Sequence, residues 1–347
     1  MPDWAQFVLL SLVKSVVVVV ILLTCVAYAV WLERKVVGRM QNRWGPSRVG
    51  PFGLLQPLAD GIKFILKEDL VPANVYKPLY IAAPMISVAL ALMSIAVVPF
   101  GEELRFGRYS TWAQITDVNI ALLVLLGVTS LAVYGVALAG WSSNSKYSLL
   151  GSLRASAQMV SYEASLGLSL LGVLMLAGSL SLRTIVDGQS GTWFGFIPKW
   201  YIFPQIFGFF VYLCAAFAET NRIPFDLPEA ETELVAGYHT EYSSMKFAMF
   251  FMAEYTNMFT VACVATLLFF GGWHGPALPF LPAVVQSFVP LLWFAVKIFL
   301  FIFLYIWIRG TLPRFRYDQL MAFGWKVLLP IAIANLLLTS LLVARWG

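Results

Sequence analysis

Long apolar runs recur along almost the whole chain and are separated by shorter polar segments. A helix that crosses a bilayer needs about 20 mostly apolar residues, and eight segments meet or approach that length. They cover residues 7–32, 80–100, 119–141, 157–177, 203–218, 247–270, 290–308 and 325–343, the fifth being the shortest. The pattern predicts an all-α integral membrane protein, a single polytopic domain over residues 1–347, with about eight transmembrane helices and additional amphipathic helices.

Composition supports this class. Apolar residues make up 60% of the chain and charged residues 12%, against about 25% charged residues in soluble domains. The runs are too long for the strands of a membrane β-barrel, which need only about ten residues. The first run has no basic segment before it and no small-residue cleavage site after it, so we expect a retained helix rather than a signal peptide.

The basic residues predict an orientation. Sixteen of the 23 Lys and Arg residues fall in or beside the loops after the first, third, fifth and seventh runs, and six fall on the opposite side. By the positive-inside rule the first side is cytoplasmic and both termini lie outside. The net charge of +5 therefore needs no nucleic-acid partner. The absence of a transit peptide favours the bacterial inner (plasma) membrane, with the mitochondrial inner membrane as the alternative.

The predicted cytoplasmic loop over residues 33–77 contains an amphipathic segment at 53–68. Its polar residues Gln56, Asp60, Lys63 and Lys67 recur at helical spacing and form a narrow polar stripe, and its leucines and isoleucines form a wide apolar face. Sixteen residues give a helix of about 24 Å, too short to cross a bilayer comfortably. We expect a helix in the interface or across the bundle, suited to the wall of a half-buried cavity.

A second cytoplasmic-side loop, over residues 219–246, is acidic. Six of the 18 acids of the chain lie within residues 219–242. Two interpretations compete: a solvated loop, or a carboxylate cluster at or inside the membrane that binds or moves cations or protons. The spacing of Asp226 and Glu229 resembles a capping box. Tyr238 and Tyr242 continue an apolar stripe from Leu234, which predicts a short helix packed against the protein.

Acids also occur inside the predicted helices. Glu163, Glu219 and Glu254 stand within or at the end of three apolar runs, where a charge is costly and usually functional. Each acid either pairs structurally with an Arg or Tyr or belongs to a site that exchanges protons. Lys297 is a candidate counter-ion for one of them.

Redox and nucleotide sites are not evident. Cys25, Cys214 and Cys263 lie in different apolar runs without C-x-x-C spacing, so we expect small buried apolar residues. His239 and His274 are far apart in the sequence and cannot alone form a metal site. Neither a G-x-G-x-x-G fingerprint nor a P-loop is present. Any electrons must therefore be carried by partner subunits.

Two long segments resemble signatures of a known family. GLLQPLADGIKFILKE at 53–68 and ETNRIPFDLPEAETELVAG at 219–237 are similar to those of the H subunit of proton-pumping NADH:quinone oxidoreductase, respiratory complex I. The triplet Glu33-Arg34-Lys35, the segment Ser161-Tyr162-Glu163 and PRFRYDQ at 313–319 are similar too.

The resemblance implies a membrane subunit that anchors the peripheral arm, forms the membrane end of the quinone tunnel and starts the proton-coupling path. It implies quinone as substrate, flavin and iron–sulfur clusters on partner subunits, and contacts with peripheral-arm subunits, membrane-arm subunits and lipid. The quinone passage would be lined by Arg34, Arg43, Asp60, Phe251 and Arg309. The proton path would contain Glu163, Glu219, Arg222, Asp226, Glu229, Glu231, Glu233, Glu241 and Glu254.

Two alternatives stay open on the sequence alone. The first is the membrane anchor of a hydrogenase-type complex, which would use the same acids but need not use quinone. The second is a stand-alone ion transporter, which would be active without partner subunits.

Overall fold

The computed structural model describes residues 3–106, 109–193, 197–226, 235–276 and 282–346. Within these residues, seven helices are long and apolar enough to cross a membrane. Their elements are α1 (Asp3–Met40), α3 (Lys77–Ser94), α4 (Ala121–Ser142), α5 (Lys146–Ala177), α9 (Ser244–Phe269), α11 (Val289–Thr311) and α13 (Leu329–Trp346), the last preceded by α12 (Tyr317–Phe323) and a π-helical turn η4 (Gly324–Leu328). The predicted all-α membrane protein is confirmed.

The fifth predicted span is shorter than the others. It forms α7 (Ile206–Glu219), whose 14 residues extend about 21 Å, less than the hydrocarbon thickness of a bilayer. The residues before it are held in turns: Tyr201 N–H donates to Gln189 Oε1 over 3.1 Å and Ile202 N–H to Phe269 O over 3.0 Å. These bonds keep the chain out of a helix until Ile206.

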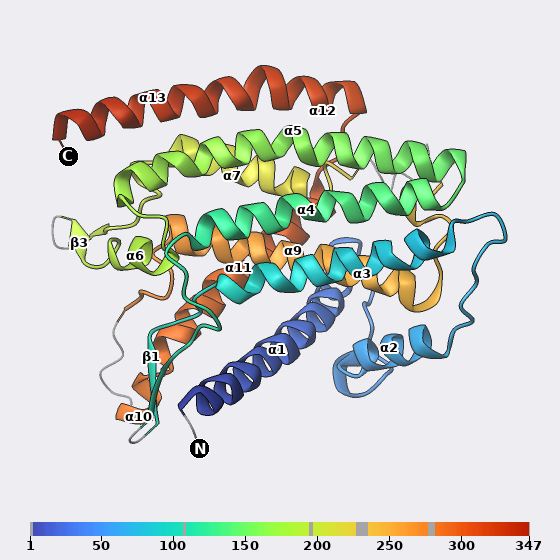
Figure 1. Cartoon of the computed structure of the whole chain (residues 1–347), viewed down its shortest axis with the longest axis horizontal. Coiled ribbons are helices and arrows are strands. Elements are labelled where there is room, and N and C mark those ends of the chain that lie inside the picture. The colour runs from blue at the N-terminus through green and yellow to red at the C-terminus, as the bar shows by residue number, and fades with distance from the viewer. Residues whose placement is uncertain (1–2, 107–108, 194–196, 227–234, 277–281, 347) are drawn as a thin grey trace.

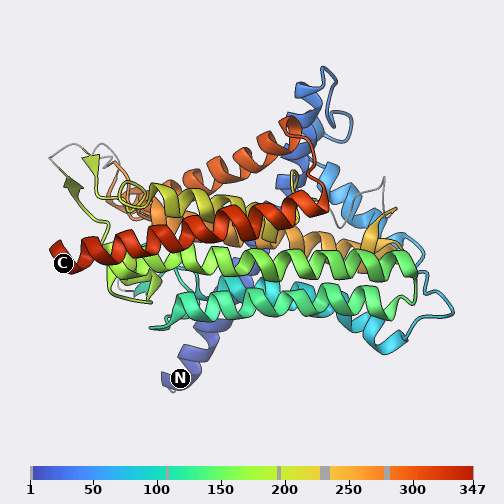
Figure 2. The same cartoon turned by 90° about the horizontal axis from the view of Figure 1, so that it is seen from above.

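The helices form an elongated bundle in which α9 is central (Figure 1). It packs against α1, α3 and α11, and 61% of its most apolar stretch is buried, against 6% for α1. Figure 2 shows α4, α5 and α13 running side by side on one flank, where α5 contacts both of the others. Cys263 is buried in α9 and Cys214 is half-buried, but Cys25 is exposed on α1, because this helix lies at the edge of the bundle. The prediction of three buried cysteines was wrong for Cys25.

Small residues let the packed helices approach one another closely. A Cβ atom on Gly135 of α4 would lie 2.1 Å from Ser87 Oγ of α3, and one on Gly140 would lie 2.0 Å from Ser152 Oγ of α5. Membrane helices commonly use such residues at their interfaces, since apolar lipid supplies little hydrophobic force between helices.

The connections at the two ends of the bundle differ. α1 begins and α13 ends toward the left in Figure 1, and α2 (Gln56–Leu66) lies toward the right with the turn between α4 and α5. Near the termini lie the hairpins β1 (Glu103–Phe106) with β2 (Tyr109–Trp112) and β3 (Thr192–Trp193) with β4 (Ile197–Pro198), the short helix α6 (Leu182–Asp187), and α10 (Ala283–Gln286). Both termini therefore share one end, as predicted.

The two predicted amphipathic helices have different outcomes. The segment at 53–68 forms a turn, η1 (Pro51–Gly53), followed by α2. The acidic segment has no α-helix between Val235 and Tyr242; its described part forms turns and the 3-10 helix η3 (Gly237–His239). Positive φ angles at Val235 (66°) and Gly237 (55°) are incompatible with a continuous right-handed helix. Tyr238 and Tyr242 are buried as their stripe predicted. Glu229 of the predicted capping box and Leu234 of the predicted stripe lie outside the described residues.

Candidate functional site

A buried charged cluster joins four parts of the chain beside the middle of α9. Glu33, near the end of α1, is 9% exposed. Arg309 of α11 donates to Glu33 Oε1, and the Tyr255 hydroxyl of α9 donates to Glu33 Oε2 over 2.7 Å. Arg222 Nη1, from the segment after α7, lies 3.7 Å from Glu33 Oε2. Among the described residues, these contacts bring together one carboxylate and two guanidinium groups.

Tyr255 stabilises this cluster in a second way. The guanidinium carbon of Arg222 lies 4.1 Å from the centre of its ring, within the range of a cation–π contact. The sequence predicted functional roles for Arg222 and Arg309 but none for Glu33 or Tyr255. The Glu-Arg-Lys triplet was the available signal for Glu33, because it brings an acid to the end of an apolar run. An isolated Tyr inside an apolar helix carried no comparable signal.

The neighbouring residue of α1 contacts α2. Arg34 Nη1 lies 2.7 Å from Asp60 Oδ2, and the Gln56 amide donates to Asp60 Oδ1 over 2.8 Å. The predicted polar stripe of α2 therefore faces the end of α1. The Arg34 side chain is 51% exposed and that of Asp60 is 22% exposed, so this pair lies at the border of the bundle, whereas Glu33 lies inside it.

The remaining residues predicted for the quinone passage lie in two places. The ring of Phe251, one turn before Tyr255 on α9, lies 4.8 Å from the Tyr255 ring, centre to centre. Phe251 therefore contacts the tyrosine whose hydroxyl donates to Glu33, and Glu33 also accepts from Arg309. Arg43 lies exposed on the loop after α1, where its Nε donates to Gln41 Oε1 over 2.8 Å.

Two of the predicted proton-path acids line a small cavity beside α9. Its volume is about 30 Å³, and its walls include Glu219, Glu254 and Asn257, which leaves room for about two water molecules. The Tyr238 hydroxyl donates to Glu254 Oε1 over 2.8 Å. Since Glu254 and Tyr255 are consecutive, the cavity and the charged cluster lie on different faces of the same turn of α9.

The other described acids of the predicted path lie around this centre. Ser130 of α4 donates to Glu163 Oε1 on α5. Asp226 is 5% exposed and pairs with Arg314 over 3.0 Å. The backbone carbonyl of Glu241 accepts from the Tyr80 hydroxyl over 2.6 Å. Glu229, Glu231 and Glu233 lie outside the described residues.

A buried amide holds the segment between α7 and Asp226 in place. The Gln158 side-chain amide of α5 lies 2.8 Å from Ala218 O, 2.8 Å from Phe225 O and 3.2 Å from Asn221 Oδ1. Gln158 is completely buried. It therefore fixes the backbone that carries Glu219, Arg222 and Asp226, a role that no sequence pattern predicted.

Lys297 has a different partner from the one predicted. Its ammonium donates to the carbonyls of Phe270, Gly272 and His274 over 2.7, 2.8 and 2.7 Å. Among these described contacts it binds the C-cap carbonyl of α9 and two carbonyls of the turn that follows, at the end of a helix where a cation is favourable. The expectation that Lys297 is the counter-ion of a carboxylate was wrong.

Comparisons with known proteins give matches over almost the whole chain. The family model described as NADH dehydrogenase matches residues 13–340. The chain is 68% identical to an H subunit of NADH-quinone oxidoreductase, numbered 2, of Koribacter versatilis (strain Ellin345), over 99% of each chain. It is 50% identical to an H subunit, numbered 1, of Solibacter usitatus (strain Ellin6076), over 98% of each.

A third relative extends the likeness beyond these two. The NADH-quinone oxidoreductase H subunit of Protochlamydia amoebophila (strain UWE25) is 53% identical, over 91% of this chain and 92% of that one. The names of these relatives favour an NADH:quinone oxidoreductase over a hydrogenase-type complex or a stand-alone transporter. The chain therefore belongs to the NADH dehydrogenase family, as an H subunit of the NADH:quinone oxidoreductase complex, respiratory complex I.

Proposed function

We propose that this subunit anchors the peripheral arm, forms the membrane end of the quinone tunnel and starts the proton-coupling path in a bacterial inner membrane. Quinone is the substrate, and it receives electrons from flavin and iron–sulfur clusters on partner subunits. The quinone passage runs past Arg34, Asp60, Phe251 and Arg309, with Arg43 on the loop beside it. Membrane lipid surrounds the exposed apolar faces of the bundle.

One observation carries the proposal: the charged cluster and the acidic cavity lie on different faces of a single turn of α9. Tyr255 donates to Glu33 on one face, and Glu254 accepts from Tyr238 on the other. A change of charge beside Glu33 thus acts across one helix on the acids that line the cavity. Such a short separation suits electrostatic coupling, because the interior screens charges far less than water does.

The chemistry follows from the charges of the chain. Quinone takes up two electrons and two protons, and negative charge that develops on its headgroup is stabilised by the guanidinium groups of Arg34 and Arg309. Any such charge weakens the hold of these cations on Glu33 and Asp60. Acids on the other face of α9 respond by binding or releasing protons, since interacting carboxylates titrate as a group.

The described acids suit a path away from the quinone. Glu219 and Glu254 share a cavity, and Glu163 lies on α5, which packs against α7. Asp226 and Glu241 belong to the described parts of the acidic segment. Glu229, Glu231 and Glu233 remain predicted members of the same path.

Replacement of Glu254 by Gln tests this proposal. The variant keeps an acceptor for Tyr238 but removes the exchangeable proton, so NADH-to-quinone turnover and the pumping tied to it should fall at least tenfold. Electron transfer from NADH to an artificial acceptor that bypasses the quinone site should be unchanged. Glu102→Gln, which changes an exposed acid at the other end of the bundle, is the matched control. An assembled Glu254→Gln complex with parental turnover and pumping contradicts the proposal.

A further inference from the structure

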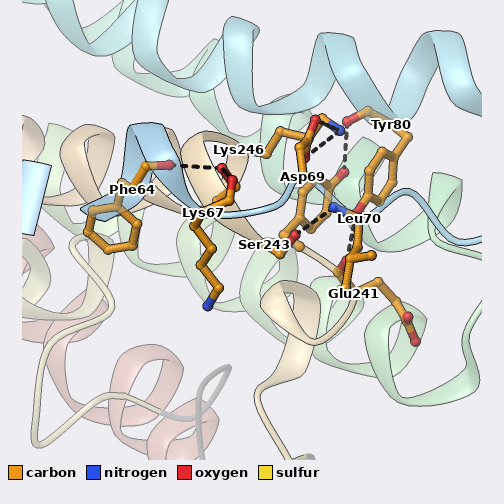
Figure 3. Close-up of polar contacts among 10 residues, drawn as sticks. Phe64, Lys67, Asp69, Leu70, Tyr80, Glu241, Ser243 and Lys246 are labelled. Carbon is orange, nitrogen blue, oxygen red and sulfur yellow. Dashed lines mark hydrogen bonds and ion pairs between the residues drawn. The ribbon is translucent and has the colours of Figure 1, made fainter. Parts of the chain in front are cut away.

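The end of α2 is bound to the beginning of α9 by two serines (Figure 3). The Ser244 hydroxyl lies 2.9 Å from Phe64 O and 3.0 Å from Lys67 O, and its proton is shared between these two carbonyls. The Leu70 N–H donates to Ser243 Oγ over 3.1 Å. Carbonyls in the last turn of a helix have no partner within the helix, so Ser244 supplies what α2 itself cannot.

An ion pair reinforces the same connection. Lys246 Nζ lies 3.0 and 2.8 Å from the two carboxylate oxygens of Asp69 and 5.3 Å from the centre of the Tyr80 ring. Figure 3 shows Lys246 between these two residues. Lys246 stands in the first turn of α9, where the helix dipole disfavours a positive charge. Its side chain is nevertheless only 12% exposed. The pair with Asp69 and the aromatic ring account for a cation at this position.

A pair of tyrosines extends the connection to the acidic segment. The rings of Tyr80 and Tyr242 stack with centres 4.2 Å apart, and the Tyr242 hydroxyl donates to Tyr80 O over 3.1 Å. Burial raises the pKa of Tyr242 to about 12, so this hydroxyl remains a donor at physiological pH. The Tyr80 hydroxyl binds the carbonyl of Glu241, whose carboxylate points away in Figure 3.

The backbone of Ser244 is strained. Its φ angle is +51°, a left-handed conformation that residues other than Gly, Asn and Asp rarely adopt. Such a conformation persists where surrounding contacts hold it in place. Here those contacts are the two carbonyls of α2, so the strain and the hydrogen bonds occur at the same residue.

Burial alone does little to hold α2. None of its residues is buried, and Leu58, Ile65 and Leu66 are 64%, 68% and 79% exposed. Its polar attachments to the bundle are therefore important: the Arg34–Asp60 pair along its length, and the contacts of Asp69, Leu70, Ser243, Ser244 and Lys246 at its end. We call the second group the α2–α9 junction.

We propose that Asp69, Ser244 and Lys246 are positioning residues, which hold the end of α2 against α9, keep its polar stripe beside Arg34 of α1, and so set how tightly the passage binds the quinone headgroup. The inference rests on the proposed function, since it takes α2 as a wall of the quinone passage. Loss of the junction lets α2 move away, and Asp60 then occupies its place beside Arg34 for a smaller fraction of the time.

The test uses the whole membrane complex and two single variants. Ser244→Gly removes the hydroxyl and also relieves the positive φ angle, so its effect reports the lost hydrogen bonds rather than strain. Asp69→Asn removes the charge from a half-exposed side chain. We expect each to raise the KM for a short-chain quinone about fivefold, the scale set by losing one or two hydrogen bonds. The kcat should change less than twofold, and NADH oxidation with an artificial acceptor should be unchanged.

Two further variants sharpen the test. Ser15→Ala is the matched control, because the Ser15 hydroxyl binds Ser11 O within α1; its KM should equal that of the parent. Lys246→Met combined with Asp69→Asn should raise KM no further than the larger single effect, since both changes break one ion pair. Independent, additive effects of the two changes overturn the pairing.

Asp60→Asn separates the two hypotheses. A raised KM in Asp60→Asn with parental KM in Ser244→Gly and Asp69→Asn overturns the junction alone. A parental KM in all three variants overturns the quinone role of α2 as well. If Ser244→Gly does not assemble, Asp69→Asn decides the question, because its side chain is 52% exposed and the change leaves a neutral amide in contact with water.

Discussion

The middle of α9 and its C-terminal end are both held by polar contacts, but of different kinds. Beside the middle of the helix, Glu33, Arg222 and Arg309 meet next to Tyr255. At the C-terminal end the Gln189 amide donates to Leu267 O over 2.8 Å, and its oxygen accepts from Tyr201 and Gly271 N–H groups. Lys297 adds its three backbone carbonyls.

The difference lies in what each network can do. The first joins full charges of opposite sign, so any new charge beside it redistributes the contacts of all its members. The second joins an amide and an ammonium to backbone groups that never change charge. We infer that the charged cluster beside the middle of α9 responds to chemistry and that the network at its C-terminal end preserves the fold, although both satisfy buried polar groups.

The largest expected effect follows from breaking the charged cluster. Glu33→Gln leaves the guanidinium groups of Arg222 and Arg309 beside a neutral amide, and breaking a buried ion pair costs about 3–5 kcal/mol. We expect much less assembled complex, and in the assembled fraction a fall in quinone turnover of at least tenfold. Native gel electrophoresis and turnover per assembled complex measure the two effects. Parental values of both would show that Glu33 contributes neither to assembly nor to quinone turnover.

A smaller effect, on stability alone, is expected at the C-terminal end of α9. Lys297→Met leaves three carbonyls without their donor, a loss of about 1–3 kcal/mol. The thermal midpoint of the complex should fall, while turnover and its pH profile per assembled complex stay parental. Lys199→Met, at an exposed position of the same end, should leave the midpoint unchanged. A shifted pH profile in Lys297→Met would show that this end takes part in proton transfer.

The smallest effect on activity is expected from cysteine labelling, which sharpens the comparison by placing the two ends of the bundle in different compartments. In a background without the three native cysteines, Ser47→Cys and Glu102→Cys should each be nearly silent in turnover. In sealed vesicles of defined orientation, an impermeant thiol reagent should label the first variant from the cytoplasmic side and the second from the outside. Labelling of position 47 from the outside would reverse the predicted topology.

The sequence was sufficient where one local property decides the structure. Apolar runs of about 20 residues predicted the long helices, since a membrane core accepts a backbone only when its hydrogen bonds are satisfied within each segment. The spacing of Gln56, Asp60, Lys63 and Lys67 predicted α2 for a similar reason: four polar residues at helical intervals define one face. The two long signature segments also predicted the family that the comparisons then showed.

The tertiary structure alone decided which charged groups meet. Arg222 and Arg309 are far apart in the sequence, and both contact Glu33, which lies near the N-terminus. No local sequence pattern predicts that contact. Likewise a half-buried lysine can pair with an acid or with backbone carbonyls, and the turn after α9 supplies the carbonyls that Lys297 binds. The acidic segment shows the same limit. The spacing of Tyr238 and Tyr242 favoured a right-handed helix, but Val235 and Gly237 have positive φ angles that interrupt one. Helical propensity is a local preference worth tenths of a kcal/mol per residue, whereas packing of the two tyrosines against α3 and α9 is decided by residues distant in the sequence.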